Sequence, residues 1–142
     1  MKELLLHSSQ PSGDASTLIE VTPESANWEF CSLTVLSLKA GASWQGSTGR
    51  DEVALVPLGG SCTVTSGDES WEIGGRRDVF DGRTSSLYLS IETDYTVGET
   101  IPWNMYDSLR RGTAAIFRAN KMFEVKPCGT RQKTKLTLLC RR

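Results

Sequence analysis

The sequence predicts a single all-β domain of the sandwich or barrel type. Three observations predict it. Short runs of β-branched and aromatic residues recur through the first hundred positions, glycine-rich turns separate them, and no long segment there repeats its apolar residues with the 3.6-residue period of a helix. A chain of 142 residues is enough for one such domain and too short for two ordinary ones. No apolar run approaches the ~18 residues that cross a bilayer, so no membrane partner is expected.

The first strands are marked by their composition and by the residues that interrupt them. Residues 17–21 predict a strand that ends at Thr22-Pro23-Glu24-Ser25, because proline cannot donate to a strand ladder. Residues 28–38 predict a longer strand whose alternation of apolar and polar side chains shifts near Leu36, which indicates a bulge there. A short segment around Trp44 follows.

Residues 52–57 form a nearly continuous apolar run, which predicts a strand buried on both faces. Gly59-Gly60 predicts a turn after it, and Ser66-Gly67-Asp68-Glu69 predicts a tight hairpin. Further strands are expected at 61–65, 71–73 and 87–91, with turns at Gly74-Gly75 and Asp81-Gly82. Cys31 and Cys62 are expected to be small core residues on strands.

The charge distribution divides the chain near residue 100. Of 16 Lys and Arg and 17 Asp and Glu, ten basic and two acidic residues lie in 101–142. We therefore expect residues 1–100 to form the barrel domain and residues 101–142 to be an irregular basic tail. Residues 106–111 are compatible with a turn or two of helix and residues 135–140 with a strand, but the pattern does not place the tail in the fold. Aromatic residues among the cations of this tail resemble single-strand binders, but no recognised motif supports nucleic acid as a partner.

Three stretches carry a resemblance to a known family: VTPESANW at 21–28, TGRDEVALV at 48–56 and GGRRDVFDG at 74–82. In order and spacing they resemble the N-terminal half of the 5-deoxy-glucuronate isomerases of myo-inositol catabolism, which are related to the 4-deoxy-5-ketouronate isomerases. The resemblance covers residues 15–98. It implies a cupin-type, jelly-roll-like β-barrel and a bicupin chain whose second cupin holds a divalent metal through histidines and a glutamate.

The chain departs from this family after residue 100. It ends before a second cupin would begin, and 101–142 shows no further match beyond a faint Gly129-Thr-Arg-Gln132. We therefore expect a shortened paralogue or a disrupted reading frame. The first residues, Met1–His7, do not resemble a signal peptide, which predicts a cytoplasmic protein.

The cupin metal motif has the form H-x-H-x-x-x-E-x₆-G. Aligning its glutamate and glycine with Glu52 and Gly59 places Gly46 and Thr48 at the histidine positions, and neither supplies an imidazole. The one histidine of the chain, His7, lies at the N-terminus. We therefore expect no metal, no other cofactor and no catalytic residue in this chain.

Binding residues are less well defined. Arg50, Arg76 and Arg77 are candidates for binding an acidic sugar, because a guanidinium can hold a carboxylate with two parallel hydrogen bonds; the alternative is that they are surface charges with local partners. Three tryptophans either form a sugar-stacking face or plug the barrel: Trp28, Trp44 and Trp71. Three carboxylates would be general bases only if buried: Glu52, Glu72 and Asp78.

Two functions are compatible with these features. One is a 5-deoxy-glucuronate isomerase-like protein represented by its metal-free first cupin, not catalytic alone, with a sugar acid as ligand. The alternative is a stand-alone, non-catalytic cupin that dimerises or binds a second cupin domain.

Overall fold

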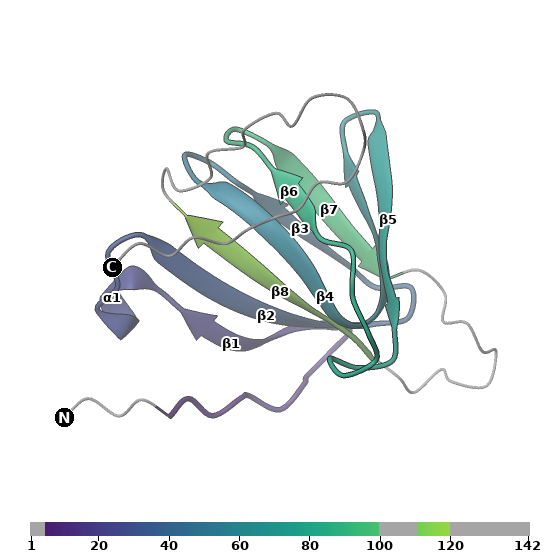
Figure 1. The fold of residues 1–142 in the computed structure, drawn as a ribbon, viewed down its shortest axis with the longest axis horizontal. Helices are drawn as coiled ribbons and strands as arrows, with labels where there is room; N and C mark the ends of the chain where they lie inside the picture. Colours follow the sequence, from purple (N-terminus) through teal and green to yellow (C-terminus); the bar gives the residue numbers. More distant parts are fainter. Residues whose placement is uncertain (1–4, 100–110, 120–142) are drawn as a thin grey trace.

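The computed structural model describes residues 5–99 and 111–119. In these ranges the chain forms one hydrogen-bonded, curled sheet of eight strands with the path β1-β2-β8-β4-β7-β3, and β5 and β6 also pair with β4 (Figure 1). The elements are β1 (Ala15–Val21), α1 (Pro23–Ala26), β2 (Cys31–Lys39), β3 (Ser43–Ser47), β4 (Glu52–Ser66), β5 (Glu69–Arg76), β6 (Leu87–Leu89), β7 (Asp94–Glu99) and β8 (Arg111–Ala119). The predicted all-β fold is confirmed.

The long strand β4 joins the two halves of the barrel. Its first half pairs with β6 and β8, and its second half pairs with β5 and β7. Register shifts occur between Pro57 and Gly59 and between Gly60 and Ser61, and Gly60 has φ +84°. The turn predicted at Gly59-Gly60 is therefore wrong, because these glycines lie at irregularities within one continuous strand. Glycine is favoured both in tight turns and in β-bulges, so the sequence alone does not distinguish the two.

The strand β8 lies in the middle of the sheet, although sequence reasoning found no place in the fold for residues 101–142. It pairs with β2 from Lys39↔Arg111 to Cys31↔Ala119, and with β4 on its other side. The sheet therefore extends past residue 100. The rest of 101–142, including the helical turn expected before Arg111 and the strand expected at 135–140, lies outside the described residues.

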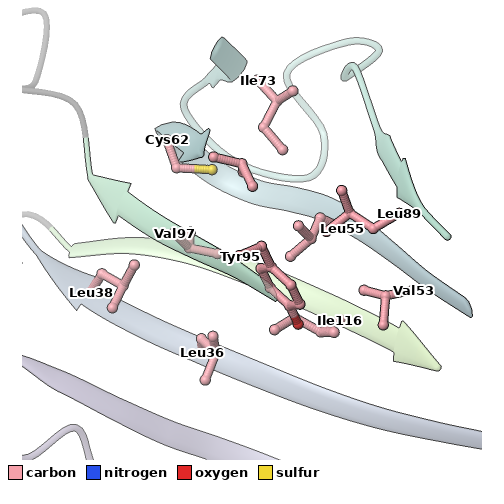
Figure 2. Close-up of a cluster of buried hydrophobic side chains, with 11 residues drawn as sticks. Leu36, Leu38, Val53, Leu55, Cys62, Ile73, Leu89, Tyr95, Val97 and Ile116 are labelled. Atoms are coloured by element: carbon pink, nitrogen blue, oxygen red, sulfur yellow. The ribbon is translucent and has the colours of Figure 1, made fainter. Parts of the chain in front are cut away.

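The core lies between the two halves of the barrel. Figure 2 shows its inward-facing side chains: Leu36, Leu38, Val53, Leu55, Cys62, Ile73, Leu89, Tyr95, Val97 and Ile116, with Val64 also in the cluster. Cys62 thus lies in the core as predicted, and Cys31 is half-buried at the start of β2.

Several residues whose side chains point to the other face of the sheet are also buried, among them Val35, Ala54 and Ala115. Burial on both faces explains why the alternation along β2 is irregular. The pairing of β2 with β8 is continuous, and the irregularity lies in β1 between Thr17 and Ile19. The bulge predicted near Leu36 is therefore wrong, and the bulge belongs to the neighbouring strand.

Candidate functional site

The position that the cupin motif gives to its first histidine is Gly46, on β3. Gly46 pairs with Tyr95 of β7, and Trp44 precedes it on the same face of the strand. A Cβ at Gly46 would lie 2.6 Å from Cζ3 of Trp44 and 2.8 Å from Cζ of Tyr95. The two rings, whose centroids are 6.0 Å apart, therefore occupy the space that a side chain at position 46 would need.

The second histidine position is Thr48, which is 1% exposed. Its Oγ1 accepts a hydrogen bond from the backbone N–H of Thr93 at 2.8 Å, and its own N–H donates to the Thr93 carbonyl at 2.9 Å. The Thr48 carbonyl accepts from the N–H of Asp51. Thr48 thus ties the end of β3 to the start of β7, and these bonds explain a small hydroxyl residue here.

The glutamate of the motif, Glu52, does not face the barrel interior. On β4 the inward residues are Val53 and Leu55, so Glu52 points to the opposite face, where Tyr88 donates a hydrogen bond to its Oε1 at 2.5 Å. Burial and the neighbouring Glu52 carboxylate raise the pKa of Tyr88 to about 12. Alignment by spacing alone placed Glu52 in the metal site, and the parity of β4 assigns the inward position to Val53.

The interior therefore does not fit a cupin metal, because glycine, threonine and valine hold the relevant positions. Within residues 5–99 and 111–119 no three histidine, cysteine, aspartate or glutamate side chains stand close enough together to hold a metal ion. Glu72 and Asp78, the other carboxylates considered as bases, are exposed.

The three arginines considered for sugar-acid binding have different surroundings. Arg50 is exposed in the loop before β4. Arg76 lies opposite Gly60 and donates through Nε and Nη2 to the Pro57 carbonyl at 3.2 and 2.8 Å. Arg50 thus lies in a loop, whereas Arg76 lies at the end of β5 with its guanidinium bonded to the backbone of β4.

Arg77 has its own partner next to it in sequence. Its Nε and Nη2 donate to the Asp81 carboxylate at 3.1 and 3.3 Å, and its backbone N–H donates to the same carboxylate at 3.0 Å. The side-chain hydrogen bond from Arg77 lowers the pKa of Asp81. These contacts are those expected of loop charges with local partners.

The tryptophans also have different environments. Trp44 and Trp71 are half-buried and pack against the core, as residues that plug a barrel do. Trp28 is 48% exposed, between α1 and β2.

Sequence reasoning missed two polar side chains inside the barrel near the end of β3, which we call the interior end of the barrel. The hydroxyl of Tyr95 is buried without a hydrogen-bond partner among the described residues, and Arg118 of β8 reaches Ser47, where its Nη2 donates to the carbonyl at 2.8 Å. Burial raises the pKa of Tyr95, while the nearby Arg118 opposes that rise. Arg118 lies two residues after the core residue Ile116 and therefore on the same face of β8, but no strand was predicted there, so this signal could not be used.

Comparison with known proteins identifies the family. The model of the KduI/IolB family matches residues 4–107. The chain belongs to the KduI/IolB family. The resemblance expected from the three sequence stretches is thereby confirmed, and it extends beyond the predicted 15–98.

Curated relatives of this family member are named 5-deoxy-glucuronate isomerase. The protein from Geobacillus thermodenitrificans (strain NG80-2) is 35% identical over 82 residues, which are 57% of this chain and 30% of the relative. The protein from Bacillus subtilis (strain 168) is 30% identical over 80 residues, 55% of this chain and 30% of the relative. The match thus spans about 30% of the length of these relatives.

Solved structures agree on the fold. An IolB-like protein from Salmonella typhimurium LT2 superposes with a TM-score of 0.66 at 24% identity, over 85% of this chain and 43% of that one. The Cnp3 cupin domain of Schizosaccharomyces pombe has a TM-score of 0.50 at 12% identity, covering 75% of this chain and 59% of that domain. None of the helices within 5–99 and 111–119 has the length and apolar character to cross a membrane.

Proposed function

We propose that this chain is a 5-deoxy-glucuronate isomerase-like protein of inositol and sugar-acid catabolism whose barrel binds no metal and does not catalyse isomerisation by itself. The observation that supports the proposal is the filled position 46, where a Cβ would lie 2.6 Å from Trp44 and 2.8 Å from Tyr95. An imidazole is larger than a Cβ, so a ligand there would require both rings to move.

The reaction itself adds a second argument. Aldose–ketose isomerisation moves a proton between adjacent carbons, so it needs a general base and a group that stabilises the developing enediolate charge. Of the carboxylates considered, Glu52 is bonded to Tyr88 on the outer face, and Glu72 and Asp78 are exposed. None of the three faces the barrel interior together with a cationic group.

The test is an isomerase assay of the purified chain on 5-deoxy-glucuronate, with and without added Zn²⁺, Mn²⁺ or Fe²⁺. The isomerase of Geobacillus thermodenitrificans serves as positive control, and elemental analysis measures bound metal. We expect no turnover above the uncatalysed rate and no stoichiometric metal. Turnover by this chain alone, or one tightly bound metal ion per chain, would overturn the proposal.

A second candidate function is a module that associates with another copy of itself. The observation that favours it is the loop after β5, where Phe80 is 92% exposed. The Arg77–Asp81 ion pair and a 2.8 Å hydrogen bond from the Phe80 N–H to Asp78 hold this loop in shape. A rigid loop loses little conformational entropy when its aromatic side chain is buried by a partner.

Sedimentation equilibrium of the native chain and of Phe80→Ser tests this second function. We expect the native chain to dimerise and Phe80→Ser to shift the equilibrium towards monomer. Arg83→Ser, a change at another exposed position of the same connection, is the matched control and is expected to dimerise normally. A native chain that stays monomeric at high concentration would exclude self-association, and a partner cupin would then be tested by mixing.

A further inference from the structure

The hydroxyl of Tyr95 is a polar group buried in the interior of the sheet. Tyr95 is 3% exposed, and its oxygen has no hydrogen-bond partner among the described residues. Figure 2 shows its ring crossing the interior from β7, with the hydroxyl directed towards β8 near Ile116. A buried hydroxyl without a hydrogen-bond partner is unfavourable, so such a group indicates a binding partner for it.

Arg118 supplies a cation at the same end of the barrel. It lies on β8 two residues after Ile116, on the same face, and its side chain is half-buried. Its Nη2 donates a hydrogen bond to the carbonyl of Ser47 at 2.8 Å, and the guanidinium lies close enough to Tyr95 to act on its hydroxyl. The ion pairs of the described ranges are Lys39–Asp14 and Arg77–Asp81, so Arg118 has no carboxylate partner there.

We propose that Arg118 and the Tyr95 hydroxyl together form a binding site for a small carboxylate at the interior end of the barrel. Both groups can donate, and a guanidinium has five N–H donors of which the Ser47 carbonyl takes one. A carboxylate accepts from both at once and compensates the charge of Arg118. Because Arg118 is half-buried and Tyr95 is deeply buried, the ligand enters from the Arg118 side with its carboxylate leading.

This site differs from the arginines predicted for sugar acids. Arg76 and Arg77 are engaged by the Pro57 carbonyl and by Asp81. Arg118 instead lies near the Tyr95 hydroxyl in a setting of low polarity, where a charge-assisted hydrogen bond is stronger. A water molecule between Arg118 and Tyr95 is the simpler occupant, and the experiment separates the two. The proposal is independent of whether the chain isomerises a sugar.

The experiment is isothermal titration calorimetry of the full chain at low ionic strength with acetate, glucuronate and inorganic phosphate, and with glucose as the neutral counterpart of glucuronate. We expect acetate and glucuronate to bind, and glucose not to bind. Arg118→Gln is expected to weaken binding about tenfold to a hundredfold, as loss of a charge-assisted hydrogen bond does. Tyr95→Phe, which removes one oxygen, is expected to weaken acetate binding about threefold to tenfold.

Arg83→Gln is the matched control, because it removes an exposed arginine elsewhere on the molecule, and it is expected to bind as the native chain does. If Arg118→Gln does not fold, Arg118→Lys and Tyr95→Phe decide, and an unchanged dissociation constant in both overturns the proposal. No carboxylate binding by the native chain also overturns it and leaves water as the occupant. Binding of phosphate without acetate would overturn the assignment to a carboxylate.

Discussion

The replacement Gly46→Ala tests the packing on which the proposed function depends. Gly46 does not have a positive φ, so alanine meets no backbone strain there, and in a strand it would ordinarily stabilise by about 0.5–1 kcal/mol. The added Cβ, however, would lie 2.6 and 2.7 Å from two ring atoms of Trp44 and 2.8 Å from one of Tyr95. Carbon atoms reach their best separation at about 3.5–4.0 Å, so the rings must move by roughly 0.7 Å or more.

Tyr95 has little room for that movement, because it is 3% exposed and packed in the core. Inserting a methyl group into a well-packed core costs about 1–3 kcal/mol, which exceeds the gain from replacing glycine. We therefore expect Gly46→Ala to lower the free energy of unfolding by about 1–2 kcal/mol. Urea denaturation followed by tryptophan fluorescence measures it.

Gly98→Ala is the matched control, because Gly98 lies on the adjacent strand β7 and a Cβ there would come no closer than 3.9 Å to the Thr63 carbonyl oxygen. It is expected to be neutral or slightly stabilising. The double variant Trp44→Leu with Gly46→Ala should show favourable coupling, since the smaller side chain relieves part of the overlap. If Gly46→Ala is as stable as Gly98→Ala, the aromatic rings do not fill the space at position 46, and the packing that supports the proposed function is refuted.

Two further predictions concern other contacts. Gly74 and Gly75 both have a positive φ, so alanine is strained at either position. Gly75→Ala is expected to lower the free energy of unfolding by about 1–2 kcal/mol. Gly74→Ala is expected to lower it much more, because the added Cβ would lie 2.4 Å from the Gly60 carbonyl oxygen, whereas a Cβ at Gly75 meets no atom. Equal losses in urea denaturation would contradict this. The pKa of Tyr88 is raised to about 12 in the folded protein, against about 10 in the unfolded chain. The neutral Tyr88 side chain therefore stabilises the fold fully below pH about 10, and this stabilisation is lost as the pH rises through about 12. Ultraviolet titration of Glu52→Gln should show a lower pKa for Tyr88, and an unchanged value would refute the assigned role of Glu52.

The sequence by itself determined the class of fold and the family. Alternating apolar residues, the hairpin at 66–69 and the apolar run at 52–57 are local signals, and local signals are sufficient to predict strands and tight turns. The three stretches at 21–28, 48–56 and 74–82 were enough to predict the family. The residue types at positions 46 and 48 likewise predicted that the histidines of the cupin motif are missing.

Only the tertiary structure decided what stands in place of those histidines and where the remaining polar groups meet. Gly46 is enclosed because Trp44 and Tyr95, from two paired strands, converge on it, and this pairing is long-range. Arg118 lies near Tyr95 because β8 lies in the centre of the sheet. The sequence did not predict this strand, because it lies in a segment rich in basic residues that has no clear strand pattern. The alternation of side chains along a strand reveals which residues share a face, but only the pairing and curling of the sheet determine which faces meet.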